Sequence, residues 1–184
     1  DRANAEEFTI PAIKKSAFTL VEMLVVIGVI GVLTAMAVPV SMRMVQKGRS
    51  TACLGNLRQL GVALNLYLGE HNQVMPVLAA GRSQKSEQLD VIDTKLREYA
   101  PDERIFCCPA DAGKIAETTG TSYHWNSALN GQSILSLNFL NNTTPTTIPV
   151  LADKEGFHTH CKSKVNILTA DGRISQGLNF TTTR

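Results

Sequence analysis

The sequence has few aromatic residues and little net charge. Phe, Trp and Tyr make up 5% of its 184 residues, and 18 basic against 16 acidic residues give a formal charge of +2. The basic residues are spread along the chain without interleaved aromatics, so the sequence indicates no concentrated basic patch. We therefore expect no nucleic-acid partner.

The sequence also lacks the short motifs of common enzymes. It contains no Gly-x-Ser-x-Gly elbow, phosphate-binding loop, dinucleotide fingerprint or His-Glu-x-x-His helix. A nucleophile built from His160 and Cys161 would depend on their adjacency in the sequence alone. We therefore expect a protein that is not an enzyme.

Cysteine is scarce, and all four cysteines follow residue 50. They therefore share one side of any membrane that an earlier segment crosses, and three pairings are possible if that side is oxidising. The neighbours Cys107 and Cys108 would be strained if bridged to each other, which favours pairing of one of them with Cys53 or Cys161. All four are disulfide candidates, and buried free thiols are the alternative.

The chain does have a long apolar run at residues 18–40, interrupted by one charge, Glu22. As a helix this run spans about 34 Å, enough for a hydrocarbon core of about 30 Å. A charge at mid-membrane costs about 2.5–3.5 kcal/mol on insertion scales, and less near an interface, so Glu22 requires a function. The run predicts a single transmembrane helix.

A cleaved secretory signal is the main alternative for this run. Lys14 and Lys15 form a basic flank, and residues 35–37, AMA, resemble a cleavage site. The length of the run, the charge of Glu22 within it and Pro39 just beyond the cut argue against a signal peptide. Basic residues flank the run on both sides, so charge counting leaves its orientation open.

Residues 14–17 read KKSA and residues 18–27 read FTLVEMLVVI. This pattern resembles the leader and mature start of a type IV prepilin or type II secretion pseudopilin. The resemblance implies that residues 1–17 are a leader, that prepilin peptidase cuts after Ala17, where Gly is more usual, and that it methylates Phe18. Residues 18–40 are then the transmembrane and assembly helix.

The same resemblance gives Glu22 a role in assembly. Cleavage frees a positive amine on Phe18, and opposite charges attract strongly in a medium of low dielectric constant. In the family, this carboxylate neutralises the N-terminal amine of a neighbouring subunit and sets the axial register. Pro39, at the place of a family proline, is expected to bend the helix. The alternative for Glu22 is a carboxylate that merely snorkels to the interface.

Residues 41–70 keep a helical period while one side becomes polar. Apolar residues recur there at spacings of three and four: Cys53, Leu57, Leu60, Leu64 and Tyr67. This spacing predicts an amphipathic continuation of the helix whose apolar stripe packs on a globular head.

Residues 71–184 predict that head. We expect one short helix at residues 89–99, and Asp171-Gly172 predicts a type I′ hairpin. Strands are expected at residues 122–125, 147–152 and 165–170. The fold class is therefore α+β and pilin-like: a long N-terminal helix, membrane-spanning in its first half and amphipathic in its second, packed on a small antiparallel sheet.

Looser motifs follow residue 51: CLGNLRQL, CPAD, SYHWN and NILTADG. They are similar to a bacterial family of prepilin-leader proteins whose C-terminal signature is a His, nine intervening residues and Asp-Gly. Here His160 precedes Asp171 by ten intervening residues and His158 by twelve. The sequence therefore departs from the His half of the signature.

The run HTHC at residues 158–161 concentrates metal-binding residue types but lacks the paired spacings of a structural zinc site. Asp153, Glu155 and Asp171 are weak calcium candidates because they place oxygen donors near loops. The resemblance adds that some secretion pseudopilins hold a C-terminal calcium. Solvated loop acids are the simpler interpretation, and we expect no cofactor.

Together these features predict a pilin-like structural subunit of the bacterial inner membrane, with its head outside the cytoplasm. Prepilin peptidase, related pilin subunits and the inner-membrane assembly machinery are the expected partners. The product is a type IV pilus-like or type II secretion pseudopilus filament in the periplasm or at the surface. The alternative is a single-pass anchored binding module with Tyr123, His124 and Trp125 as a stacking surface for a ligand such as a glycan, although core packing is the simpler interpretation of this aromatic strand.

Overall fold

The computed structural model describes residues 19–159 and 163–177. The chain divides into two compact units, Asp1–Ser41 and Met42–Arg184, each described by itself below. One continuous helix, α1 (Leu20–Glu70), runs through both.

In the first unit α1 is apolar and exposed. Every residue from 19 to 41 is exposed, and none of the most apolar 18-residue window, of mean hydropathy 2.6, is buried. By length and composition this helix is able to cross a membrane, whereas the core helix of a soluble protein would be covered. Pro39 lies inside α1, and the helix is not interrupted there.

In the second unit α1 turns one face to a hydrophobic core. The five predicted stripe residues are all buried: Cys53, Leu57, Leu60, Leu64 and Tyr67. Gly61 lets the helix approach the sheet, because a Cβ at that position would lie only 3.3 Å from Cδ1 of Leu168. The predicted amphipathic helix and its packing face are therefore confirmed.

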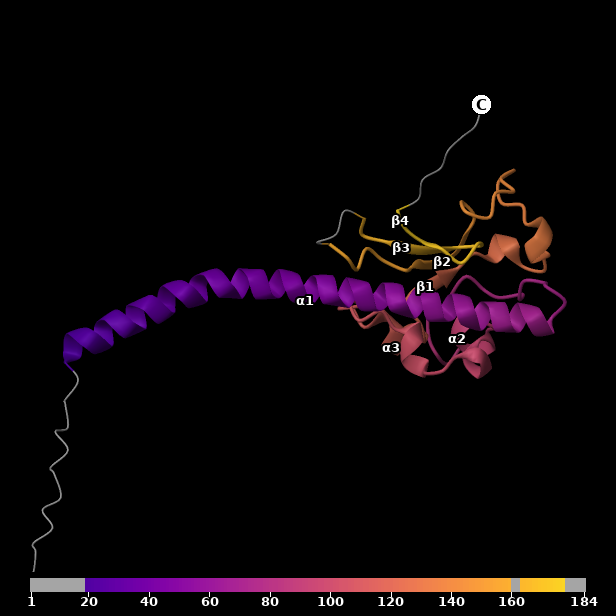
Figure 1. Ribbon diagram of the computed structural model, residues 1–184. Helices are drawn as coiled ribbons and strands as arrows, with labels where there is room; N and C mark the ends of the chain where they lie inside the picture. The colour runs from indigo at the N-terminus through magenta and orange to yellow at the C-terminus, as the bar shows by residue number, and fades with distance from the viewer. Residues whose placement is uncertain (1–18, 160–162, 178–184) are drawn as a thin grey trace, which may run out of the picture. The chain divides into compact units, whose positions relative to one another are not determined.

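The sheet has four strands in the order β1-β2-β3-β4, and every neighbouring pair is antiparallel. Its strands are β1 (Tyr123–Trp125), β2 (Pro149–Asp153), β3 (Asn166–Thr169) and β4 (Ile174–Gln176). Every residue of β3 is buried, consistent with its central place beside α1 (Figure 1). The predicted strands are confirmed.

The hairpin between β3 and β4 forms as predicted, but its turn is not type I′. A type I′ turn needs positive φ at both central residues, and only Gly172, at φ +81°, has it here. The amide of Gly172 donates to the carbonyl of Thr169 at 2.9 Å, and Leu168 pairs with Ile174. The loop therefore has one more residue than a type I′ hairpin allows, and Gly172 takes the left-handed position that closes it.

Short helices and turns lie between α1 and β1 and between β1 and β2. The helix predicted at residues 89–99 is shorter than expected: α2 spans only Ile92–Lys95 and gives way at Leu96 to a 3-10 turn, Arg97–Tyr99. The other short elements are 3-10 turns at Glu103–Phe106, Ser127–Leu129 and Ile134–Ser136, and α3 at Ile115–Thr119. With α1 packed on a small antiparallel sheet, the fold is α+β and pilin-like, as the sequence predicts.

Candidate functional site

The first turn of α1 is closed by a reciprocal cap between Thr19 and Glu22. The Glu22 carboxylate accepts from the Thr19 amide at 2.8 Å and from its hydroxyl at 2.9 Å, and the Glu22 amide donates to the Thr19 hydroxyl at 3.3 Å. This is a capping box, Thr-x-x-Glu, which fixes where a helix begins. The role predicted for Glu22 rests on its charge alone and misses this cap, although the Thr-x-x-Glu spacing is present in the sequence.

The predicted cleavage residues Ala17 and Phe18 lie outside the described residues. The structure therefore shows the helix that follows the predicted cleavage site, beginning at Leu20, with the Glu22 side chain exposed at its start.

The described cysteines differ sharply in exposure. Cys53 on α1 and Cys108 are buried, Cys107 is exposed, and all three are free thiols. The predicted disulfide is therefore not formed among these three in this structure. Cys161, the fourth candidate, lies outside the described residues.

Four buried side chains with metal-binding atoms meet in the head: Cys53, Cys108, Asp153 and His158. One ligand atom from each lies within 4.8 Å of the others. The Cys53 sulfur is 3.4 Å from Oδ1 of Asp153, the Cys108 sulfur is 3.7 Å from Nε2 of His158, and that nitrogen is 3.3 Å from Oδ2 of Asp153. We call these four residues the head cluster.

Neighbouring groups hold the head cluster in place. The backbone amide of Asn166 donates to Oδ2 of Asp153 at 2.7 Å, and the Tyr123 hydroxyl lies 3.4 Å from the Cys53 sulfur. The contact with Cys108 and then burial raise the pKa of the Cys53 thiol, and burial raises the pKa values of Tyr123 and Asp153. Cys53 is therefore a protonated thiol at neutral pH, and it donates to Oδ1 of Asp153.

The weak calcium candidates do not converge. Asp153 belongs to the head cluster, whereas Glu155 is exposed on the loop after β2. Asp171 sits in the β3–β4 turn, where it accepts from the Thr169 hydroxyl and contacts Arg173 at 3.2 Å. Among the described residues, the group of ligand atoms that does gather contains neither Glu155 nor Asp171.

The aromatic strand proposed as a stacking surface is mostly core. Tyr123 and Trp125 are 0% and 2% exposed, and the Trp125 ring nitrogen donates to Oδ1 of Asn130 at 2.7 Å. His124 alone of the three faces outward. The structure therefore favours core packing of this strand over the alternative of a stacking surface, because alternation along β1 turns its two large rings inward.

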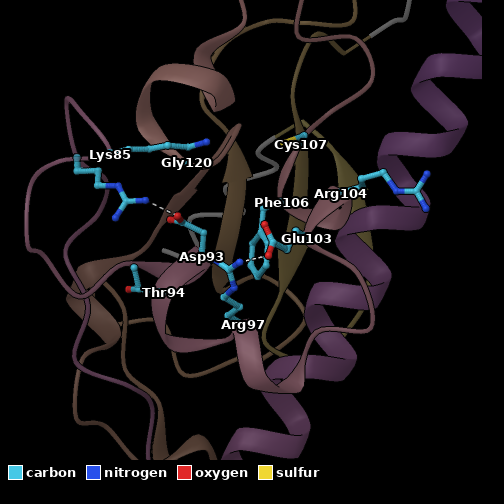
Figure 2. Close-up of a pocket in the computed structure, with 10 residues that line it drawn as sticks. Lys85, Asp93, Thr94, Arg97, Glu103, Arg104, Phe106, Cys107 and Gly120 are labelled. Atoms are coloured by element: carbon cyan, nitrogen blue, oxygen red, sulfur yellow. Dashed lines mark hydrogen bonds and ion pairs between the residues drawn. The ribbon is translucent and has the colours of Figure 1, made fainter.

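A cavity of about 440 Å³ opens beside α2 and is lined largely by charged side chains (Figure 2). Its three arginines are matched by acids of the head itself: Arg82 by Asp93, Arg97 by Glu103 and Arg104 by Asp102. The wall of this cavity is therefore a network that largely neutralises itself.

Thiol labelling tests the predicted difference in exposure between Cys107 and the two buried cysteines. In a Cys161→Ser variant under native conditions, we expect a maleimide to label Cys107 and to leave Cys53 and Cys108 unmodified, because only Cys107 is exposed. Burial of part of the side chain raises the pKa of the Cys107 thiol, so labelling should be slow at neutral pH and accelerate as the pH rises. Peptide mapping measures each site, and equal labelling of all three would contradict the structure.

Comparison with known protein families gives a match for the N-terminal segment. A model described as the prokaryotic N-terminal methylation motif matches residues 13–38, which include Ala17, Phe18 and Glu22. Comparisons with curated proteins and with solved structures give no match for this chain. The chain therefore carries a prepilin-type methylation motif. Together with the exposed apolar helix, this motif fits a membrane-anchored protein. The resemblance of the head to a family of prepilin-leader proteins stays a prediction.

Proposed function

We propose that this protein is a pilin-like structural subunit, cut by prepilin peptidase between Ala17 and Phe18 and assembled into a type IV pilus-like or type II secretion pseudopilus filament. One observation carries the proposal. The methylation motif at residues 13–38 overlies a helix whose residues from 19 to 41 are all exposed. An apolar surface of this extent requires lipid or neighbouring subunits to cover it.

The surface of the apolar helix suits both environments. Before assembly, lipid covers it in the inner membrane, and in the filament the same residues pack against neighbouring subunits. A Cβ added at Gly28 or Gly31 would meet nothing within 4 Å, so these positions leave room for another helix to approach. The inner-membrane assembly machinery then moves the subunit from lipid to filament, with the head outside the cytoplasm.

The proposed role is structural, with the head displayed on the filament. The fold supports this role, since α1 is one continuous helix that includes both the apolar segment and the stripe buried in the head. The alternative, an anchored binding module, loses its specific support because Tyr123 and Trp125 are buried.

The mature N-terminus tests the proposal directly. In cells with an active prepilin peptidase, we expect mass spectrometry to find a mature chain that begins at N-methylated Phe18. Deletion of the peptidase gene is the control and should leave the leader attached. A mature chain beginning at Val38, as a secretory signal predicts, or a leader retained in the presence of active peptidase, would contradict the proposal.

A further inference from the structure

The head cluster brings together residues from four separate parts of the second unit. Cys53 lies in α1, Cys108 in the loop after the 3-10 turn Glu103–Phe106, Asp153 at the end of β2, and His158 in the loop that follows. Each side chain is buried, and the side chains of His158 and Asp153 are 1% and 0% exposed. The fold therefore concentrates two sulfurs, a carboxylate and an imidazole in one buried place.

Three donor separations in the head cluster match those of a metal site. When Zn–S bonds are about 2.3 Å and Zn–N and Zn–O bonds about 2.0–2.1 Å, tetrahedral ligand atoms lie about 3.3–3.8 Å apart. The observed separations in the head cluster are 3.4 Å for Cys53 to Asp153, 3.7 Å for Cys108 to His158, and 3.3 Å for His158 to Asp153. All four ligand atoms lie within 4.8 Å of one another, and Cys53 and His158 contact different oxygens of Asp153, so the four side chains must close in to share one ion.

Hydrogen bonding accounts for the carboxylate of the head cluster, which is partnered by the Asn166 amide and the His158 ring, but it leaves the two sulfurs with weak partners. A thiol is a weak hydrogen-bond donor, yet Cys53 is one of the groups that face the buried carboxylate of Asp153. Burial of ionisable groups is costly unless they are well paired or coordinate a metal. A divalent cation at the centre would bind the carboxylate and the two sulfurs once they have lost their protons, and would offset two of the three negative charges.

The surroundings match those of a metal site as well. The Asn166 amide donates to Oδ2 of Asp153 and so fixes how the carboxylate faces the cluster, while the Tyr123 hydroxyl lies within reach of the Cys53 sulfur. Donors of this kind orient metal ligands and stabilise the charge on a thiolate.

We propose that Cys53, Cys108, Asp153 and His158 form a structural site for one zinc ion, or a divalent transition metal of the same ligand preference. Two sulfur ligands with one nitrogen and one oxygen suit a tetrahedral ion that prefers soft donors. On binding, the two thiols release their protons and the ion ties α1 to β2 and to two loops of the head. The sequence did not indicate this site, because the spacings between its ligands are long and irregular.

Cobalt titration of the full chain tests the site. The protein is purified in detergent, reduced, stripped with a chelator and titrated with Co²⁺. We expect thiolate-to-cobalt charge-transfer absorption and tetrahedral d–d bands that saturate at one ion per chain and disappear when Zn²⁺ is added. Absence of these bands from folded, reduced wild-type protein would overturn the proposal, as would a Cys53–Cys108 disulfide in protein purified without reductant.

Adjacent cysteines supply a matched pair of variants. Cys108→Ser should weaken Co²⁺ binding at least about tenfold and reduce the charge-transfer band, whereas Cys107→Ser should leave both unchanged. His158→Gln is the second ligand variant, in case Cys108→Ser fails to fold, and Cys161→Ser tests for a competing thiol. Bands that survive in folded Cys108→Ser and His158→Gln but vanish in Cys107→Ser or Cys161→Ser would contradict this assignment.

Discussion

Replacement of Glu22 by Gln is expected to remove most of the protein from filaments while leaving membrane insertion and leader cleavage intact. The reason is electrostatic, because a carboxylate attracts the free amine of a processed neighbour strongly in hydrocarbon, and a neutral amide does not. Gln is also able to serve in a capping box, so this change removes the charge and keeps the start of α1. Filament incorporation is measured by immunoblotting of sheared or fractionated filaments.

Two further variants separate the charge from the cap. Glu22→Leu removes both and should be at least as defective as Glu22→Gln. Thr19→Ala removes the hydroxyl that bonds Glu22 and keeps the charge, so it should assemble close to the wild-type level. If Glu22→Gln assembles normally and Thr19→Ala does not, Glu22 acts through the helix start and the pairing role is wrong.

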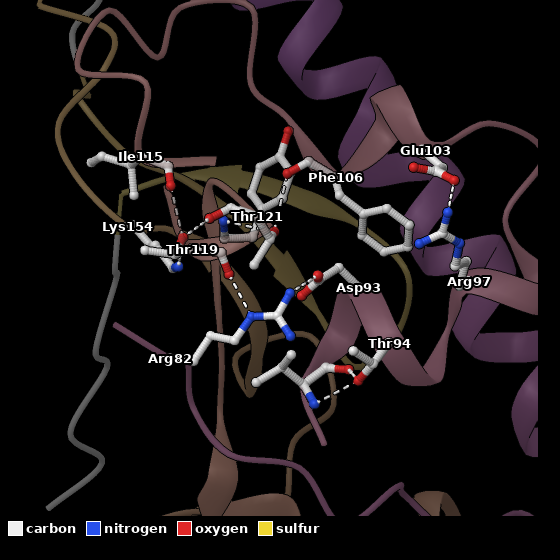
Figure 3. A network of polar contacts seen from close by, with 12 residues as sticks. Arg82, Asp93, Thr94, Arg97, Glu103, Phe106, Ile115, Thr119, Thr121 and Lys154 are labelled. Atoms are coloured by element: carbon white, nitrogen blue, oxygen red, sulfur yellow. Dashed lines mark hydrogen bonds and ion pairs between the residues drawn. The ribbon is translucent and has the colours of Figure 1, made fainter. Parts of the chain in front are cut away.

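Asp93→Ala is expected to destabilise the head by about 3–5 kcal/mol, the usual cost of leaving one partner of a buried ion pair uncompensated. Asp93 and Arg82 form such a pair, with side chains 12% and 7% exposed. Figure 3 shows Arg82 held from a second side by the carbonyl of Thr119, at 2.8 Å. Gly120, at φ +94°, packs so closely on the pair that a Cβ would collide with it. Denaturant unfolding of the full chain in detergent measures the loss.

Matched controls identify the cause of that loss. The double variant Arg82→Met with Asp93→Leu should recover much of the stability, because it leaves no unpaired charge. Glu117 forms an ion pair with Lys114 at the surface, where the two side chains are 67% and 72% exposed. Glu117→Ala breaks this pair and should lower the free energy of unfolding by less than about 1 kcal/mol. A loss for Asp93→Ala no larger than that for Glu117→Ala would show that the buried pair contributes little.

Local patterns in the sequence predicted most of the architecture. The spacing of Cys53, Leu57 and Leu60 identified the buried face of α1, and alternating or apolar runs identified the strands, because side-chain periodicity directly reflects which face is covered. The turn after β3 was predicted as a hairpin but assigned the wrong type. Its form depends on where the two strands pair, which the dipeptide Asp171-Gly172 does not determine alone.

One candidate site could be predicted from the sequence and the other could not. The motif around Ala17, Phe18 and Glu22 is contiguous, so the sequence by itself determined the prepilin-type segment and the long helix. The head cluster joins Cys53 to Cys108, Asp153 and His158 over a hundred residues of chain, and only the tertiary structure decided that they meet. The physical reason is that periodicity and short motifs record local geometry, whereas convergence of distant side chains follows from how β2 and its neighbouring loops pack against α1.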